Sequence, residues 1–317
     1  MSQVLIVTRK DDPHADLVVT DLAELATKVF RLNTECATEY DFSLRLNGGK
    51  IKNRITSLKL DLDDVTAVYL RRRSFPQLLV DPRYLEFAQG EWIKLFRNIW
   101  TLLQDRYWMN SPDALESAKD KLHQLRVAQK IGFTVPDTTM TNSLDSVREL
   151  RGRERKLIYK AFDGGALYPG SEQRIYTTVL GEEQFEEEQR ESLLVCPGIF
   201  QTYQEKAYEL RVTVIRDQVI AVRIDSQNEP ATTVDWRQGD FLNLTHTLVE
   251  LDRACQEKCI QLLRELSLQF GSIDLIRTNE DEYVFLEINA NGQWAWLQGL
   301  ADAPISQSIA RALAAQK

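Results

Sequence analysis

Two acidic residues and one amide near the C-terminus have the spacing of a divalent-cation site. They lie in the stretch SIDLIRTNEDEYVFLEINAN, which is typical of two strands around a polar turn. If Glu280 and Asp281 form the turn, Asp274 lies directly opposite Glu287 in an antiparallel pair. Asn289 follows two residues after Glu287 and points to the same face. Two carboxylates and an amide oxygen are therefore expected to converge.

The same register makes the other face of the hairpin aliphatic, because it pairs Leu275 with Leu286 and Ile273 with Ile288. Carboxylates about 5 Å apart at Cβ destabilise a sheet unless a cation neutralises them. Magnesium prefers a few oxygen ligands together with phosphate oxygens of a substrate. The pattern predicts a magnesium site. An exposed strand face with two solvated acids is the open alternative.

A lysine and a glycine-containing loop form a candidate phosphate site. Lys160 lies near the end of a predicted strand over residues 157–162, just before Asp163, Gly164 and Gly165. The backbone of such a loop can close over phosphate groups, and the lysine can neutralise them. Taken alone, an ordinary surface lysine beside a turn is the simpler interpretation.

Four other charged residues are candidates for contacts with a nucleotide. Glu209 and Arg211 share one face of a predicted strand over residues 209–215, which fits a surface ion pair or contacts to ribose and phosphate. Lys121 lies on a predicted helix and Arg237 in a loop. Both fit solvated side chains equally well.

Three consecutive arginines, Arg71, Arg72 and Arg73, follow a predicted buried strand over residues 65–70. They should lie at the carboxyl end of that strand, which in an α/β layer borders a cleft. We expect this basic cluster to receive an acidic segment of a substrate, with a solvated basic turn as the open alternative.

The composition narrows the class of protein. At 317 residues, 43 % apolar and 27 % charged, the chain has room for two or three packed units. Its net charge of −8 argues against broad contacts with nucleic acid. No apolar run approaches the roughly 20 residues of a membrane span, so no membrane partner is expected. The four scattered cysteines are expected to be reduced thiols, which predicts a cytoplasmic location.

The order of predicted elements divides the chain into three domains, of α/β and α+β class. An N-terminal α/β domain over residues 1–112 has strands and helices at 4–8, 16–29, 30–32, 65–70 and 86–103, and a hairpin at 42–46 and 51–60. A small central domain over residues 113–197 has elements at 113–131, 157–162, 174–179 and 182–190. A C-terminal domain over residues 198–317 has elements at 198–203, 209–215, 219–224, 251–270, 273–276, 283–288 and 305–315.

The order of these motifs resembles the ATP-grasp superfamily over nearly the whole chain. The residues that carry the resemblance are DKLHQLRVAQKIGFTVP, the strand that ends in Lys160, FQTYQE, YELRVTVI, SIDLI and FLEINAN. Within the superfamily the chain is similar to ribosomal protein glutamate ligases. It is more similar to the microviridin-type peptide maturases, the graspetide synthetases, in VLIVTRKDD, VYLRRRS, LVCPGIFQTYQEKAYELRVTVI, RIDSQ, VDWR and FLEINANGQWAWLQ.

The resemblance implies an ATP-grasp fold, ATP and Mg²⁺ as cofactors, and a role for each candidate residue. Lys121 and Lys160 would contact phosphates, Gln201 and Tyr203 the hinge on the adenine side, and Glu209 the ribose. Arg211 and Arg237 would assist at the phosphates, while the magnesium ligands would be Asp274, Glu287 and Asn289.

The resemblance also implies a reaction. A substrate carboxylate attacks the γ-phosphate of ATP, and the acyl phosphate is then displaced by a hydroxyl or amine to give an ester or amide. Lys160, Arg211 and Arg237 would offset the negative charge. In such maturases the partner is a precursor peptide, whose Glu or Asp side chains are closed onto Thr, Ser or Lys.

Two other functions stay open: a ligase that adds amino acids to a protein tail or a metabolite, and a non-catalytic nucleotide-binding partner protein. A homodimer is an open alternative for the assembly.

Overall fold

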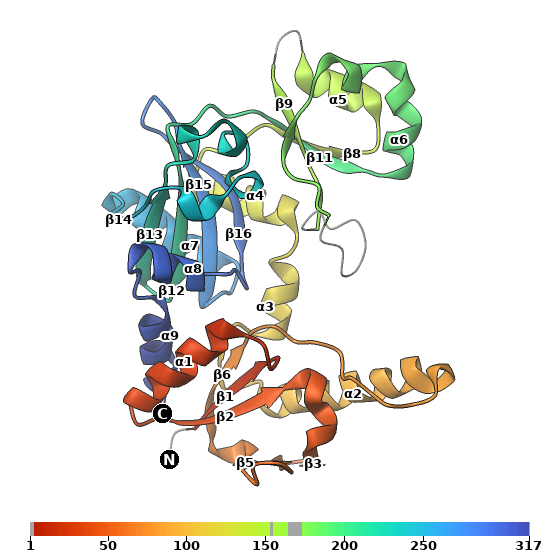
Figure 1. The fold of residues 1–317 in the computed structure, drawn as a ribbon, viewed down its shortest axis with the longest axis vertical. Helices are drawn as coiled ribbons and strands as arrows, with labels where there is room; N and C mark the ends of the chain where they lie inside the picture. The colour runs from red at the N-terminus through yellow and green to blue at the C-terminus, as the bar shows by residue number, and fades with distance from the viewer. Residues whose placement is uncertain (1–2, 153–154, 164–172, 317) are drawn as a thin grey trace.

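The computed structural model describes residues 3–152, 155–163 and 173–316. Within these ranges the strands form four sheets. Figure 1 shows the parallel sheet and its helices at one end of the molecule, with the five-stranded sheet and the small central sheet at the other end. The predicted mixture of α/β and α+β units is confirmed.

The parallel sheet has the strand order β2-β1-β6-β7. Alternate side chains of β1 point to opposite faces, so Val4 and Ile6 join the cluster beneath α1 and α9, whereas Leu5 and Val7 join the cluster beneath α2. Burial on both faces explains why these strands are continuous apolar runs. Their bounds and those of the helices are Gln3–Thr8 (β1), Lys28–Asn33 (β2), Val65–Leu70 (β6), Tyr107–Met109 (β7), Pro13–Glu24 (α1), Pro82–Leu102 (α2) and Ile305–Ala314 (α9).

The helix expected over residues 16–29 ends early. Ala26 has a left-handed φ of 52°, which turns the chain out of α1 and into β2. The predicted hairpin at 42–60 is present, but its second arm is divided into two strands. The strands of this separate antiparallel sheet are Tyr40–Arg45 (β3), Gly48–Asn53 (β4) and Lys59–Asp61 (β5).

The central sheet has the order β10-β9-β11-β8 and is antiparallel. The helix predicted over residues 182–190 is wrong: those residues form two 3₁₀ turns, and α6 begins at Arg190. The strand predicted over residues 174–179 is reduced to its last two residues. The elements of this unit are Thr138–Thr141 (β8), Leu144–Arg151 (α5), Leu157–Lys160 (β9), Thr178–Val179 (β10), Arg190–Val195 (α6) and Gly198–Thr202 (β11).

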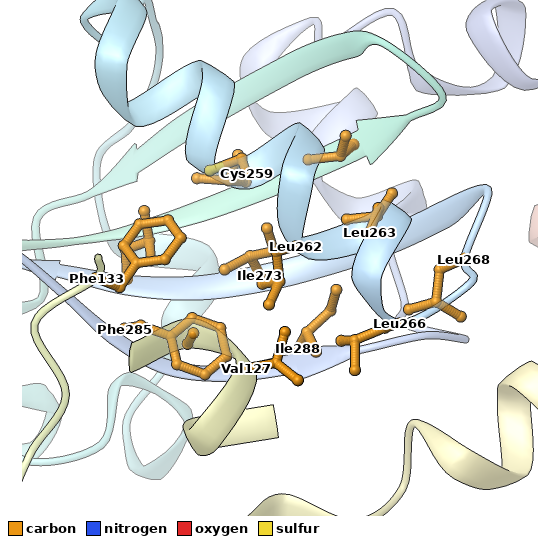
Figure 2. Packing of buried hydrophobic residues seen from close by; sticks show 14 of the residues in the cluster. Val127, Phe133, Cys259, Leu262, Leu263, Leu266, Leu268, Ile273, Phe285 and Ile288 are labelled. Carbon is orange, nitrogen blue, oxygen red and sulfur yellow. The ribbon is translucent and has the colours of Figure 1, made fainter. Parts of the chain in front are cut away.

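The five-stranded sheet has the order β14-β13-β12-β15-β16 and is antiparallel. Helices α4 and α7 cover one face, where Val127 and Leu262 pack against Ile273, Phe285 and Ile288 (Figure 2). Burial of these apolar side chains fixes the strand faces. The elements are Tyr208–Ile215 (β12), Gln218–Ile224 (β13), His246–Val249 (β14), Arg253–Glu265 (α7), Phe270–Arg277 (β15), Tyr283–Asn289 (β16) and Ala295–Ala301 (α8).

The long helix expected over residues 113–131 is two helices, Pro112–Ser117 (α3) and Lys121–Lys130 (α4). The break occurs because the Asp120 side chain accepts a hydrogen bond from the His123 backbone N–H at 3.0 Å and caps a new helix. Lys121 therefore lies in the first turn of α4. This helix packs on β16.

The expected domain boundaries stay a proposal, with one refinement. The strand β11 pairs with β8 and β9, so the central sheet continues to Thr202, beyond the expected boundary at residue 197. We propose the second boundary after Thr202. The 3₁₀ turns among the described residues are Thr34–Glu39, Leu62–Asp64, Glu182–Phe185, Glu187–Gln189, Ser226–Asn228, Pro230–Thr232, Trp236–Gln238 and Phe241–Asn243.

The predicted register of the β15–β16 hairpin is confirmed at Asp274 and Glu287 but is wrong near the turn. Asp274 is the partner of Glu287, and Ile273 of Ile288, as predicted. A bulge after Asp274 then shifts the pairing, so Leu275 lies opposite Phe285 instead of Leu286. The turn is longer than two residues, because the strands end at Arg277 and Tyr283.

Two further features concern the chain as a whole. None of the helices among the described residues has the length and apolar character needed to cross a bilayer. The four cysteines, Cys36, Cys196, Cys255 and Cys259, are all free thiols.

Candidate active site

A cavity of about 1420 Å³ is lined by residues that follow strands of the parallel sheet and by residues of the central and five-stranded sheets. Its floor is the face of the five-stranded sheet turned away from α4 and α7, and this face carries Asp274, Glu287 and Asn289. One wall holds the arginines that follow β1 and β6, and the opposite wall holds β9 and residues 202–204. The volume exceeds the roughly 300–1,000 Å³ of ordinary small-molecule sites, so two substrates can be held together.

The three predicted metal ligands lie together on this floor. Asn289 Nδ2 is 3.2 Å from Asp274 Oδ2 and 3.1 Å from Glu287 Oε1. A half-turn of the Asn289 amide presents its oxygen to the same point. Among the described residues no larger cluster of His, Cys, Asp and Glu could hold a metal ion. The set is made of oxygen donors alone, which fits Mg²⁺ better than zinc or a soft metal.

Each of the two carboxylates has a cationic partner. Arg211 in β12 is the direct cross-strand partner of Asp274, and its Nη1 donates to both carboxylate oxygens at 2.6 Å. Lys121 Nζ donates to Glu287 Oε2 from the first turn of α4. The family resemblance implied that Lys121 and Arg211 contact phosphates. In the structure both side chains lie beside the acids that would hold the metal.

The surroundings shift the pKa values of Asp274 and Glu287 in opposite directions. Burial raises the pKa of Asp274, and the nearby Glu287 charge adds to this, although Arg211 opposes it. Burial also acts to raise the pKa of Glu287, but Lys121, Lys160 and Arg237 outweigh it and hold that pKa well below its usual range. Glu287 is therefore ionised at neutral pH, which is the form that a metal ligand requires.

Lys160 and Arg237 add two further positive charges near the acids. Burial lowers the pKa of Lys160, Glu287 raises it, and Lys121 and Arg237 lower it again. Arg237 is held by Asp235, which accepts from its Nε at 2.8 Å and from its Nη2 at 2.7 Å. This paired Asp235 raises the pKa of Arg237 and fixes the direction of its guanidinium. Both cations line the cavity.

The predicted ribose and adenine residues have different positions. Glu209 lines the cavity and accepts a hydrogen bond from Lys206 Nζ at 2.6 Å; burial raises its pKa, and Lys206 opposes this. Tyr203 lines the cavity beside Thr202 and Gln204. Gln201 does not line it, because its side chain is buried and donates to Thr138 Oγ1 at 2.9 Å.

The three consecutive arginines do line the cavity, as their place after β6 predicts, but they are not equivalent. Arg71 is only 2 % exposed, and its Nη1 donates to Asn291 Oδ1 at 2.8 Å and to the Gly292 carbonyl at 2.9 Å. Its Nε is 3.8 Å from Asp12. Arg71 therefore ties the parallel sheet to the turn after β16, whereas Arg72 is half-buried and Arg73 exposed.

Several residues of the cavity were missed from the sequence. Arg9 follows β1, which pairs in parallel with β6, so the carboxyl ends of the two strands bring Arg9 and Arg71 to one edge. That signal was present in the sequence. Trp236 and Trp296 also line the cavity, with ring centroids 5.1 Å apart, and no local pattern pairs them. Gly164 and Gly165, the expected phosphate loop, lie outside the described residues.

Gly292 lies close to both Arg71 and Arg211. A Cβ added there would be 2.8 Å from Ser272 Oγ and 3.0 Å from Arg211 Nη2, and the Gly292 carbonyl accepts from Arg71. Only a residue without a side chain allows this close approach. The FLEINANGQ segment therefore needs its glycine for packing beside the acids.

Comparisons with known proteins show which family the chain is similar to. The family model of the MvdD pre-ATP-grasp domain matches residues 3–116. Among solved structures, a RiPP-associated ATP-grasp ligase of Chryseobacterium gregarium, in complex with ADP and a leader and core peptide, has a TM-score of 0.89 at 30 % identity. The match covers 99 % of this chain and 96 % of that chain.

The macrocyclases MdnC, bound with precursor peptide MdnA, and MdnB of Microcystis aeruginosa MRC are similar as well. Their TM-scores are 0.83 and 0.78 at 26 % and 27 % identity, and both matches cover 99 % of each chain. No curated protein matches the chain. With its ATP-grasp fold and a relative at 30 % identity over nearly its full length, the chain belongs to the RiPP-associated ATP-grasp ligases.

Proposed function

We propose that the protein uses ATP and Mg²⁺ to activate Glu or Asp side chains of a ribosomally made precursor peptide, and joins them to Thr, Ser or Lys side chains of the same peptide. The observation that carries the proposal is the cavity floor, where two carboxylates and an amide are surrounded by Lys121, Lys160, Arg211 and Arg237. The family relationship supports the same reaction, since the similar structures hold ADP or precursor peptides.

In this proposal Asp274, Glu287 and Asn289 hold the magnesium ion, which when bound neutralises phosphate charge. Arg211 keeps Asp274 in place through its two hydrogen bonds, and Lys121 does the same for Glu287. Both carboxylates are thereby directed at one point before any ligand arrives. Such preorganisation lowers the cost of gathering charge at the reacting centre.

Lys160 and Arg237 act on the transferred phosphoryl group. The substrate carboxylate attacks the γ-phosphorus, the bond to the bridging oxygen of ADP breaks, and an acyl phosphate forms. Two anions must approach each other in this step, and Lys160 and Arg237 offset their repulsion from the cavity wall. The hydroxyl or amine of the second side chain then attacks the acyl carbon and loses a proton. The bond from the acyl carbon to the phosphate oxygen breaks, so phosphate is released and an ester or amide is formed.

Glu209 and Tyr203 are proposed for the ribose and the adenine. Glu209 is held by Lys206 and reaches the cavity, and Tyr203 lies at the start of the segment that joins the central sheet to β12. We no longer propose that the Gln201 side chain contacts the adenine, because it is buried against Thr138. Arg72 and Arg73 are proposed to bind acidic residues of the peptide, and Arg71 to position the Asn291 turn.

The test is to incubate the purified protein with ATP, Mg²⁺ and candidate short peptides encoded near its gene, and to measure the mass of each peptide. Cross-linking removes one water for each bond and adds nothing. A peptide whose mass rises by an amino acid instead identifies a ligase of free amino acids. An unchanged mass for every candidate peptide, with no release of ADP, leaves a nucleotide-binding protein without catalysis.

A cytoplasmic location is part of the same proposal. The reaction consumes ATP, and the four free cysteines suit a reducing compartment.

A further inference from the structure

The strand β16, which carries Glu287 and Asn289, is an edge strand of the five-stranded sheet. Strand β15 lies on one side of it, and α4 packs against it from elsewhere in the chain (Figure 1). An edge strand leaves every second backbone N–H and C=O without a partner in the sheet. When such groups are buried, another part of the chain must supply their hydrogen bonds.

Gln124 of α4 supplies these bonds at Ile288, the residue between the two predicted metal ligands. Its Oε1 accepts from the Ile288 N–H at 3.0 Å, and its Nε2 donates to the Ile288 carbonyl at 2.9 Å. The same Nε2 donates to the Ala118 carbonyl at 2.6 Å. One side-chain amide thus makes the two bonds to a single residue that a neighbouring strand would make. Gln124 is 2 % exposed, so water does not compete for these groups.

The three bonds determine which type of side chain can serve at this position. The side chain must accept from one N–H and donate to two carbonyl oxygens, which a primary amide can do. An ionised glutamate accepts hydrogen bonds but donates none, and methionine does not replace the donors either. Asparagine keeps the amide but is shorter by one methylene group. A glutamine is therefore matched to this place by its length and by its donors.

Holding Ile288 by its backbone determines the direction of its neighbours. Side chains alternate along a strand, so that of Ile288 packs beneath α4 and α7 (Figure 2), while those of Glu287 and Asn289 point into the cavity. Lys121 lies three residues before Gln124 on the same face of α4 and donates to the Glu287 carboxylate. One helix face therefore holds both the acid and the backbone of the next residue.

A second buried amide holds the chain directly after the predicted ligands. Asn110 Nδ2 donates to the Ala290 carbonyl and to the Phe270 carbonyl, both at 2.8 Å. Its Oδ1 accepts from the N–H of Gln269 at 2.7 Å and of Phe270 at 3.0 Å. This amide ties the end of β16 to the start of β15. Asn289 thus lies between two residues whose backbones are held by buried side-chain amides.

We propose that Gln124 is a positioning residue of the metal site: its amide takes the place of a missing strand at Ile288 and holds Glu287 and Asn289 at the spacing that Mg²⁺ requires. The inference rests on the proposed function, since it assumes that these two residues and Asp274 hold the ion. Mg²⁺ demands nearly ideal octahedral geometry, so a strand end that can move lowers the affinity. Gln124 itself touches neither the ion nor the substrate.

The experiment measures the dissociation constant of Mn²⁺, a paramagnetic probe that also takes six oxygen ligands, by electron paramagnetic resonance of the full chain with saturating ADP. Gln124→Met keeps a side chain of similar size and removes all three bonds. It should weaken Mn²⁺ binding by roughly tenfold or more. The matched control is Gln129→Met, an exposed glutamine of the same helix, which should bind Mn²⁺ as the wild type does.

Binding of ADP without metal, measured by calorimetry in EDTA, separates positioning from a general loss of structure. Tyr203 and Glu209, proposed for the adenine and ribose, lie outside α4 and β16, so Gln124→Met should leave this affinity at the wild-type value. A damaged fold would lower both affinities together, and that result would overturn the positioning role. Gln124→Asn, which is too short to make all three bonds, should also weaken Mn²⁺ binding alone.

Hydrogen exchange of the wild-type chain adds a test that needs no variant. The Ile288 amide should exchange as slowly as those of the central strand β12, although β16 is an edge strand. Fast exchange at Ile288, or equal Mn²⁺ affinities in the wild type and both Gln124 variants, overturns this inference alone. A wild-type chain that binds no Mn²⁺ in the presence of ADP overturns the metal site of the proposed function together with this inference.

Discussion

Arg211 in β12 and Asp274 in β15 are direct partners across the sheet, and Arg211 Nη1 donates to both carboxylate oxygens at 2.6 Å. The arginine side chain is 9 % exposed and the aspartate 17 % exposed, so water screens the pair weakly. The pair joins the middle of the five-stranded sheet to the candidate metal site. The stability of the fold and the geometry of the site therefore depend on the same contact.

Arg211→Met should destabilise the protein by about 3 kcal/mol, because removal of one partner leaves the other charge buried without compensation. Asp274 would be expected to become protonated and to lose its value as a metal ligand. Urea unfolding measures the first effect, and the dependence of ADP release on Mg²⁺ concentration measures the second. Unchanged stability together with unchanged magnesium dependence would show that the pair supports neither the fold nor the metal site.

Lys121→Gln should make the protein less stable towards acid. The folded-state pKa of Glu287 lies below its ordinary 4.5, so the ion pair stabilises the fold above about that pH and the stabilisation is lost as pH falls further. Without Lys121, only Lys160 and Arg237 oppose the effect of burial, so the pKa of Glu287 rises and the loss moves to higher pH. Melting temperatures between pH 3 and 7 test this, with Lys119→Gln, an exposed neighbour, as the control.

Arg71→Met and Arg73→Glu should separate positioning from substrate binding. Arg71 is buried and holds Asn291 and Gly292, so its loss should cost about 2 to 4 kcal/mol of stability. Arg73 is exposed in the cavity wall, so its reversal should leave the melting temperature unchanged and raise KM for an acidic peptide, by roughly tenfold. Equal effects of both variants on stability would show that the arginines are not divided in this way.

Gly292→Ala should lower activity and stability, since the new Cβ would lie 2.8 Å from Ser272 Oγ and 3.0 Å from Arg211 Nη2. Overpacking of this kind costs about 1–3 kcal/mol. Gly299→Ala in α8 adds a methyl group to open space and should be neutral or slightly stabilising. Thermal unfolding and initial rates of the two variants, measured together, give the comparison. Equal behaviour would mean that the Gly292 contacts relax without consequence.

The sequence predicted the pairs Asp274–Glu287 and Ile273–Ile288 from an assumed two-residue turn at Glu280 and Asp281; both pairs are confirmed, although the turn is longer. It did not predict the bulge after Asp274, since the extra residue, Leu286, is apolar and fits either face. The bulge brings Leu286 to the cavity wall. The sequence therefore predicted the pairing of the two acids, but not the position of the residue beside them.

The arginines show a second limit of sequence reasoning. Their place after β6 was predictable, because the carboxyl ends of parallel strands border a cleft. The burial of Arg71 was not, since its partners Asn291 and Gly292 lie far along the chain. For the same reason the pairing of Lys121 with Glu287 and of Arg211 with Asp274 depends on how α4, β12 and the hairpin pack. No spacing within one segment encodes these contacts.

The ratio of ADP released to water lost from the precursor peptide tests the proposed ATP-dependent cross-linking. We expect one ADP for each water lost, dependence on Mg²⁺, and loss of both products by at least about 100-fold in Glu287→Gln. Glu282→Gln, an exposed residue next to the turn of the same hairpin, should keep the wild-type ratio and rate. Water loss without ADP, or full ADP release by the Glu287→Gln variant, would rule out ATP-dependent activation at this site.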